Sequence, residues 1–550
     1  MAILRLNPVR LDNFRGDLFG GLTAAIVALP LALAFGVASG AGPLAGLYGA
    51  VFVGLFASLF GGTPSQISGP TGPMTIVAAS VFTQYASQPG VAFTVVMMAG
   101  GFQLLFGYLK LGRYVNLMPY PVISGFMTGI GCILVIMQLN PLLGFNAPQT
   151  VVNALSVLPG YLADADMSAV AVGLTALAVC VLTPRRLARV VPAHLLGLVA
   201  ATALALALPG VAVLGPMPSG MPDLQMPSFN FAQLNHMLLS AAVLAALGSI
   251  DSLLTSLVAD NVTRTYHDSD KELLGQGLGN IAAGLFGGIP GAGATIRTLS
   301  NVHAGGRTAL SGIVHAVALA VLVIGLGDLV AYIPYAALAG ILIKVGIDVI
   351  DWRFIRRMHR APRVDQVLLI VVLFLTIFVD IITAVGTGVV LASLVFVKDM
   401  AEHQVESIKA ISDPDHDRLF TPEDAAVCRR CREHALYLHL SGLISFGAAN
   451  EMTRKFGKVG SYQVLAIDLL DVPRVDGSAA LALEELIQRA VDSDKTVFLV
   501  GLSGPVMNLM RRLGSLDLIA ETRLLDSRSA AVQAIKAELE RQGLPLLPER

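Results

Sequence analysis

The chain has 550 residues, of which 55% are hydrophobic and 14% are charged, and its mean hydropathy is +0.71. Soluble proteins have roughly 25% charged residues, so a water-soluble globule of this composition would expose large apolar patches. The net charge of −1 lacks the strong basic excess of a dedicated nucleic-acid-binding protein. The composition therefore indicates a membrane protein and predicts no nucleic-acid partner.

The charged residues are unevenly distributed along the chain. Residues 1–400 contain 19 Lys and Arg and 16 Asp and Glu, and the remaining 150 residues contain 18 and 22. We therefore expect a transmembrane domain over 1–400, a polar linker over 401–432 and a cytoplasmic domain over 433–550.

Apolar stretches separated by Gly, Pro and polar residues predict fourteen membrane spans. They are expected at 18–38, 43–60, 72–85, 91–110, 117–139, 167–183, 191–208, 235–259, 273–288, 294–305, 308–330, 333–347, 365–379 and 381–398. The Lys and Arg residues of the connections precede the first span or follow even-numbered ones, which places both termini in the cytoplasm of a bacterial inner membrane. A missed or additional pair of spans would preserve this pattern.

Fourteen spans divide into two halves of seven, and the third span of each half is short and follows a run of Gly and Pro. Such matched interruptions are typical of the midplane binding site of a transporter. Thr71, with Pro73 just inside, would open one half-helix; Gly293, Ala294 and Thr295 would open the other. Two facing helix N-termini attract an anion. The alternatives are turn-rich extracellular loops and ordinary helix capping.

Asp251 lies within the apolar eighth span, where an isolated carboxylate is costly and needs a partner. Thr255 follows it by one helical turn, and Arg297 lies on the same half-helix as Thr295. We expect an Asp251–Arg297 ion pair beside the two helix N-termini. A purely structural pair, or an Arg297 that reaches the cytoplasmic boundary, are the competing interpretations.

Several runs of residues together resemble the SulP sulfate-permease family of anion transporters over nearly the whole chain, and most of all its bacterial bicarbonate transporters. The runs are 28–36 (ALPLALAFG), 69–75 (GPTGPMT), 248–255 (GSIDSLLT) and 291–298 (GAGATIRT). The resemblance implies a seven-plus-seven inverted repeat of core and gate domains, an elevator-type transport cycle, homodimers and a C-terminal STAS domain.

By motif, the resemblance places the substrate anion between Thr71 and the residues Gly293, Ala294 and Thr295, with Arg297 beside them. In the bicarbonate transporters the residues matching Asp251 and Thr255, with the Gly-Ala-Thr run, hold sodium. Those transporters have a small residue where this chain has Arg297. We expect a fixed guanidinium to neutralise Asp251, so that sodium dependence is weak or absent and proton coupling or exchange is favoured. No other cofactor is expected.

The C-terminal region alternates strand and helix patterns, with strands expected at 435–444, 464–470 and 496–501 and helices at 479–491, 505–513 and 529–542. The run 468–479 resembles the STAS signature, in which Ser478 matches a phosphorylated serine; the alternative is a plain helix cap. The domain would otherwise bind a protein partner or a nucleotide.

Cys428 and Cys431, with His434 and His439, have the spacing of part of a metal or redox site. The second cysteine pair of a structural zinc site is missing, so coincidence in a linker is the favoured interpretation and no metal site is expected.

The fold class is therefore an all-α polytopic membrane domain followed by a small α/β STAS domain. The function expected is secondary active transport of sulfate or bicarbonate, and not an enzymatic activity. Besides the anion and membrane lipid, a second copy of the chain is the expected partner. A C4-dicarboxylate symporter, an anion channel or exchanger of the same fold, and a membrane sensor that signals through the STAS domain are the alternatives.

Overall fold

The computed structural model describes residues 6–8, 11–113, 119–146, 150–184, 187, 191–208, 210–216, 222–325, 330–379, 381–406, 409–411, 419–445 and 462–548. These residues form two compact units, Met1–Val390 and Leu391–Arg550, and each is described by itself.

The first unit is built from helices, the last of which continues beyond Val390 into the second unit. In chain order they are α1 (Phe14–Ala38), α2 (Pro43–Phe60), α3 (Gly72–Gln84), α4 (Pro89–Tyr108), α5 (Tyr120–Leu142), α6 (Val151–Ala163), α7 (Met167–Leu182), α9 (Ala193–Ala207), α10 (Leu234–Thr263), α11 (Ser269–Leu285), α12 (Thr295–His303), α13 (Ala309–Gly325), α15 (Tyr335–Val349), α16 (Trp352–Ile355), α17 (Arg363–Phe378) and α18 (Ile381–Glu406).

Each of the fourteen predicted apolar segments coincides with one of these helices. Within the described residues, five helices are long and apolar enough to cross a bilayer alone, or six when the bent pair α6 and α7 counts as one span. Several predicted spans, among them α3 and α12, are therefore too short to cross as single straight helices. Helix α6 lies in a connection for which no helix was predicted.

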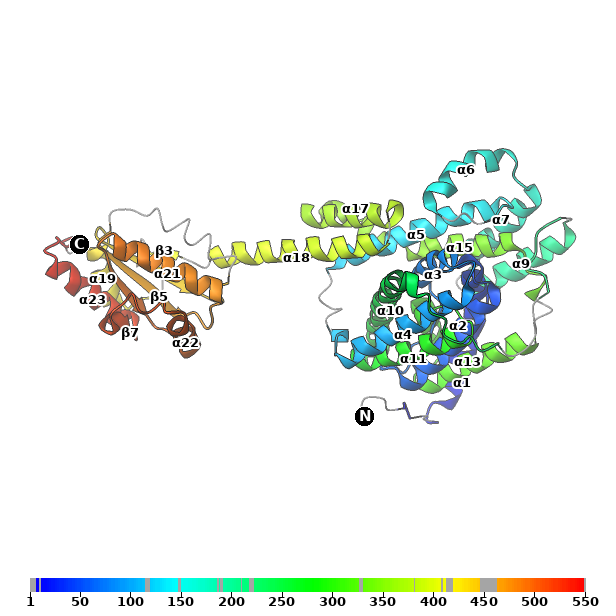
Figure 1. Ribbon diagram of the computed structural model, residues 1–550, viewed down its shortest axis with the longest axis horizontal. Coiled ribbons are helices and arrows are strands. Elements are labelled where there is room, and N and C mark those ends of the chain that lie inside the picture. The colour runs from blue at the N-terminus through cyan, green and yellow to red at the C-terminus, as the bar shows by residue number, and fades with distance from the viewer. Residues whose placement is uncertain are drawn as a thin grey trace. The chain divides into compact units, whose positions relative to one another are not determined.

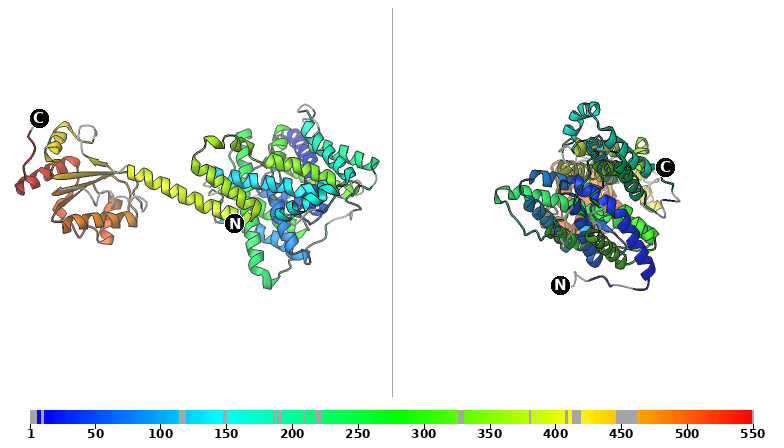
Figure 2. Two further views of the ribbon diagram at one scale, coloured as in Figure 1. Left: turned by 90° about the horizontal axis from the view of Figure 1, so that it is seen from above. Right: turned by 90° about the vertical axis from the view of Figure 1, so that its right-hand side faces the viewer.

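The helices pack in two groups, each of which draws on both halves of the sequence. Helices α1, α2, α4, α10, α11 and α13 contact one another in the first group, and α5, α7, α9, α15 and α17 form the second. Figure 1 shows the groups one above the other, and Figure 2 shows them from two further directions. The first group thus combines early spans of both halves of the sequence, and the second group combines late spans of both halves.

Close helix contacts in the first group depend on glycine. A Cβ atom at Gly100 of α4 would lie 2.5 Å from the Gly277 carbonyl oxygen of α11, and one at Gly277 would lie 2.7 Å from the Gly100 carbonyl oxygen. Small residues allow helix backbones to approach closely where no hydrophobic effect drives association. Neither position can take a side chain unless the two helices separate.

Two short strands, one from each half of the sequence, pair with each other. Strand β1 (Ser68–Gly69) pairs antiparallel with β2 (Ala292–Gly293), with Ser68 opposite Gly293. Helix α3 begins three residues after β1, and helix α12 begins two residues after β2. The strand pair therefore fixes the N-termini of the two short helices relative to each other.

The second unit is an α/β domain whose sheet has the strand order β3-β4-β5-β6-β7. The strands are β3 (Lys409–Ile411), β4 (Ala435–Ser441), β5 (Val464–Asp471), β6 (Thr496–Val500) and β7 (Leu524–Leu525), and the helices are α19 (Pro422–Cys431), α21 (Gly477–Asp492), α22 (Gly504–Leu513) and α23 (Arg528–Arg541). Strands β4 to β7 are parallel, and β3 joins antiparallel. Apolar clusters lie on both faces, with α21 and α22 on one and α19 and α23 on the other.

The segment expected as a linker contains regular structure. It includes the end of α18, strand β3, which pairs with β4, and helix α19, which packs on α23. Helix α19 was not predicted because its sequence is rich in charged residues. Its apolar side chains Ala425 and Cys431 are buried. The described part of 401–432 thus belongs largely to the α/β fold.

A buried carboxylate joins three elements of this unit. Asp468 of β5 accepts hydrogen bonds from Nδ1 of His439 at 3.0 Å and from Nε of Arg528 at 2.7 Å. Burial would raise the pKa of the Asp468 carboxyl, but the two donors outweigh it and hold that pKa below its usual value. Arg528 also donates to Asp471, so it ties the start of α23 to the end of β5.

Asp17 of α1 binds a segment far away in the sequence, directly before α13. Its side chain is 0% exposed, and Oδ1 accepts the backbone N–H groups of Arg307 at 2.7 Å and Thr308 at 2.9 Å. Oδ2 accepts the Thr308 hydroxyl at 2.7 Å. The carboxylate thereby holds the two residues that precede α13, where the Thr308 hydroxyl in turn caps the first turn through the Leu310 N–H, and it joins the two halves of the first unit.

We expect Asp17→Ala to lower the free energy of unfolding by about 2 kcal/mol, because three donors lose their acceptor in a buried position. Thermal unfolding of the purified protein in detergent measures the change as a lower Tm. Asp12→Ala, at an exposed position just before α1, is the matched control and should leave Tm unchanged. Equal Tm values for the two variants would contradict the stabilising role of Asp17.

Candidate functional site

The two short helices begin at the centre of the first group of helices. Thr71 is the N-cap residue of α3, with Pro73 in the first turn, and Ala294 is the N-cap residue of α12, so that Thr295 is its first residue. Both starts follow directly from the β1–β2 pair. Backbone N–H groups without an intrahelical partner, and the positive ends of two helix dipoles, are therefore close to one strand pair.

Helix α10 links both helix starts. The Thr71 hydroxyl donates to Oδ2 of Asp251 at 2.7 Å. One turn further along α10, the Thr255 hydroxyl lies 3.0 Å from the Gly293 carbonyl oxygen and 2.8 Å from the Thr295 hydroxyl. Asp251 and Thr255 share one face of α10, and that face holds the start of α3 with one residue and that of α12 with the other.

The expected Asp251–Arg297 ion pair is not formed: no nitrogen–oxygen distance of 4.0 Å or less joins these two described side chains. Arg297 is 2% exposed, and its Nη2 donates to the Pro70 carbonyl oxygen instead. Its Nη1 lies 2.7 Å from the position of a Cβ atom at Gly69, on the side of β1 that faces Ala50 of α2. The guanidinium therefore packs against the backbone of β1 and not against the carboxylate.

Arg297 and His315 both retain buried polar atoms without a partner. Among the described residues, Nη1 of Arg297 and both ring nitrogens of His315 have no hydrogen-bond partner. His315 of α13 is 0% exposed, and its Nδ1 lies 3.2 Å from the position of a Cβ atom at Gly54 of α2. The Arg297 guanidinium thus places a positive charge near the site without direct contact with Asp251.

The structure assigns contacts to residues that the sequence patterns did not single out. The Ser252 hydroxyl oxygen accepts the Gly293 N–H at 2.9 Å, and Glu272 of α11 accepts Gln66 Nε2 at 2.8 Å and the Thr63 N–H at 2.9 Å. Glu272 is 1% exposed. A polar residue within an apolar segment indicates a functional site, so Ser252, which directly follows Asp251, could have been found from the sequence. Glu272 lies at the boundary of a predicted span, where a charged residue is a weaker indication.

The two C-terminal candidates change in character. Asp476, and not Ser478, is the N-cap residue of α21, and its carboxylate accepts the Ala479 N–H at 2.8 Å; Ser478 is exposed in the first turn. A plain cap is therefore the wrong interpretation of Ser478, because the aspartate two residues earlier occupies that position. Phosphorylation of Ser478 stays a prediction.

Cys428 and Cys431 belong to the packing of α19. Cys431 is 2% exposed within the apolar cluster beneath α19 and α23. Burial raises the pKa of the Cys428 thiol to about 12, which opposes the thiolate that redox chemistry or metal binding requires. His439 bonds Asp468, and the described residues contain no group of three or more His, Cys, Asp or Glu that could hold a metal ion.

Comparisons with known proteins match both units. Residues 14–372 match the model of the sulfate permease family, and residues 428–531 match that of the STAS domain. The bicarbonate transporter BicA of Picosynechococcus sp. is 46% identical over 540 residues, which cover 96% of this chain and 95% of that protein.

Two solved structures show the same architecture. The transmembrane domain of a cyanobacterial BicA is 48% identical, with a TM-score of 0.65. The match covers 70% of this chain and 99% of that domain. The murine anion transporter Slc26a9 in its inward-facing state is 20% identical, with a TM-score of 0.83 and coverage of 96% and 92%, which shows the fold alone. The predicted fold class, a helical membrane domain followed by a STAS domain, is confirmed.

We expect Gly293→Ala to impair the site while the protein still folds. The new methyl carbon would lie 2.4 Å from Nε2 and 2.7 Å from Cδ of Gln66, so either the Gln66 side chain must give up its hydrogen bonds to Glu272 and Ser256 or β2 must move. Anion uptake by proteoliposomes should fall at least tenfold at an unchanged elution volume in size-exclusion chromatography. Gly101→Ala on α4, where a Cβ atom meets nothing within 4 Å, is the control. Equal uptake by both variants would contradict the close fit at Gly293.

Proposed function

Because the chain belongs to the sulfate permease family, we propose that it is a secondary transporter of a small inorganic anion, with bicarbonate as its first substrate. The support for bicarbonate is the 46% identity to BicA over nearly the full length of both chains. Sulfate, the anion in the name of the family model, is the second candidate.

The observation that carries the proposal is the position of two helix N-termini beside one strand pair, both tied to α10. A transported oxyanion must lose hydration water and regain comparable hydrogen bonds. Backbone N–H groups and threonine hydroxyls supply these bonds without a full positive charge in contact, so that binding stays weak enough for release. We place the anion between Thr71 and the run Gly293, Ala294 and Thr295.

Asp251 occupies part of this site in the structure, because its Oδ2 accepts the Thr71 hydroxyl. An arriving anion competes for that hydroxyl and is repelled by the carboxylate charge. We infer that a cation which neutralises Asp251, either a proton or a sodium ion, binds together with the anion. Thr255, Gly293 and Thr295 would supply the oxygen atoms for sodium. The expectation of sodium independence required a direct Asp251–Arg297 pair, and that pair is absent.

Alternating access would follow from movement of one helix group against the other. The strand pair, α3, α12 and α10 would move together, because hydrogen bonds join them. The second group would form the fixed scaffold of an elevator-type cycle, in a homodimer whose termini lie in the cytoplasm.

We expect Thr295→Val to raise KM for anion uptake roughly tenfold or more, since a hydrogen bond to a charged ligand contributes about 1.5–3 kcal/mol. Uptake of radiolabelled bicarbonate, sulfate and succinate into proteoliposomes measures the change and identifies the substrate. Thr175→Val is the control, because that hydroxyl donates to the Ala171 carbonyl oxygen within its own helix. Unchanged KM in Thr295→Val would refute the anion site.

We expect Asp251→Asn to abolish cation-driven accumulation, because a neutral amide no longer takes up a proton or sodium. Uptake is measured with a sodium gradient, with a proton gradient and with neither. Wild-type accumulation that needs one gradient identifies the coupling ion. Gradient-dependent accumulation that survives in Asp251→Asn would remove Asp251 from the coupling mechanism.

An anion channel of the same fold is the alternative from another functional class. It would use the same positive site without a coupled conformational cycle. Counterflow, in which unlabelled anion inside the vesicle accelerates entry of labelled anion, requires a carrier. Its absence together with unsaturable flux would favour the channel.

A further inference from the structure

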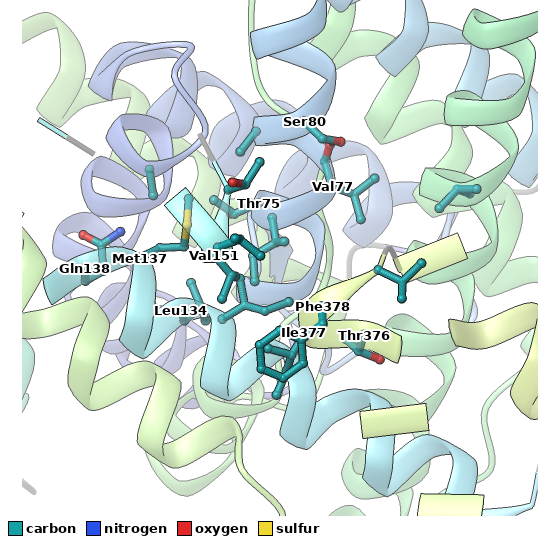
Figure 3. Close-up of a pocket in the computed structure, with 18 of the residues that line it drawn as sticks. Thr75, Val77, Ser80, Leu134, Met137, Gln138, Val151, Thr376, Ile377 and Phe378 are labelled. Carbon is teal, nitrogen blue, oxygen red and sulfur yellow. The ribbon is translucent and has the colours of Figure 1, made fainter. Parts of the chain in front are cut away.

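A cavity of about 410 Å³ lies beside the first turns of α3 (Figure 3). Its wall includes Thr75 and Ser80 of α3, Gln138 of α5, and residues 150–152 at the start of α6. Thr75 is one helical turn from Thr71, so this cavity, called the α3 cavity below, runs along α3 from the proposed anion site towards the end of that helix.

The start of α6 contributes free hydrogen-bond donors to the α3 cavity. Thr150 is the N-cap residue, and its Oγ1 accepts the Asn153 N–H at 3.2 Å, which leaves the hydroxyl hydrogen available. The N–H groups of Val151 and Val152 belong to the first helical turn, where no intrahelical acceptor exists. With 13 residues, α6 is long enough to carry a dipole whose positive end lies at these groups.

Gln138 is the second, independent feature. It is 6% exposed, and its amide has no hydrogen-bond partner among the described residues. The same residue borders a second cavity of about 360 Å³, so it lies in the wall that the two cavities share. A buried amide without a protein partner is costly, and a ligand or water must satisfy it.

Among the remaining hydroxyls of the wall, that of Ser240 on α10 has no acceptor among the described residues, whereas three others are already engaged. The hydroxyls of Thr75, Ser80 and Thr376 already donate to backbone carbonyl oxygens of their own helices. None of the described residues that line the cavity carries a charge, so no carboxylate attracts a cation there. The available donors are therefore the Gln138 amide, the start of α6 and the Ser240 hydroxyl.

We propose that the α3 cavity contains a second anion site, in which the N–H groups of Val151 and Val152, the Thr150 hydroxyl and the Gln138 amide bind the transported oxyanion. The proposal rests on the proposed function, since it places this site on the path to Thr71. Neutral donors hold the anion weakly, as a transit site requires. With cytoplasmic termini, the cavity serves entry from outside the cell.

The test compares Gln138→Glu, Gln138→Leu and the control Gln84→Glu. Gln84 is exposed in the last turn of α3 and does not line the cavity. Gln84→Glu therefore introduces the same negative charge outside the cavity. Uptake of radiolabelled sulfate or bicarbonate is measured in intact cells, for outside access, and in inside-out vesicles. Gln138→Glu should raise KM from the outside at least tenfold, Gln138→Leu about threefold, and neither should change KM from the inside.

Equal shifts in Gln84→Glu and Gln138→Glu, or equal shifts from both sides of the membrane, would overturn the second site. Binding is also measured without transport: electron density for selenate at residues 150–152 of the full-length protein should be present in wild type and lost in Gln138→Glu. Selenate density that persists in the variant, or is absent from wild type, contradicts the site. A wild-type protein that moves no anion would instead refute the proposed function, and the selenate result would still decide the site.

Discussion

The organisation of the membrane unit depends on one face of α10. Asp251 holds the start of α3 through Thr71, and Thr255 holds the start of α12 through Thr295 and the Gly293 carbonyl. Two helices that begin in the interior of a membrane domain leave N–H groups unpaired, and such groups are tolerated only where protein or a ligand satisfies them. Because one helix fixes both starts, the strand pair, α3 and α12 form a single polar element within the apolar packing.

In the proposed function, the Asp251 carboxylate has two roles that exclude each other. When Asp251 is ionised, it accepts the Thr71 hydroxyl and places a negative charge beside the start of α3. When a cation neutralises it, the positive end of α3 is free to attract a diffusible anion. In the proposed cycle, coupling would then need no large rearrangement at the site, because one cation would exchange the negative charge of Asp251 for that of the transported anion.

The apolar segments, their spacing and the distribution of Lys and Arg were sufficient to predict fourteen helices of the membrane unit, because segments that lie in lipid must be apolar and helical. The partners of Arg297 were not predictable in this way. The sequence gives the distance of Arg297 from the start of α12 but not the direction of its side chain, which turns towards α2 and binds the Pro70 carbonyl oxygen. Helix α6 contains Pro159 and borders a Gly- and Pro-containing connection, and α19 is rich in charge; both are stabilised by packing that composition does not reveal.

Arg297 then explains how a site without a direct cation can still favour anions. Its guanidinium is buried, bonded to the Pro70 carbonyl just after β1 and separated from Asp251, so it forms no contact pair that would cancel its charge. In an interior of low dielectric constant such a charge acts over several ångströms. It favours negative charge near both helix starts whether Asp251 or a transported anion supplies it. The same residue in contact with the anion would bind it more tightly and slow its release.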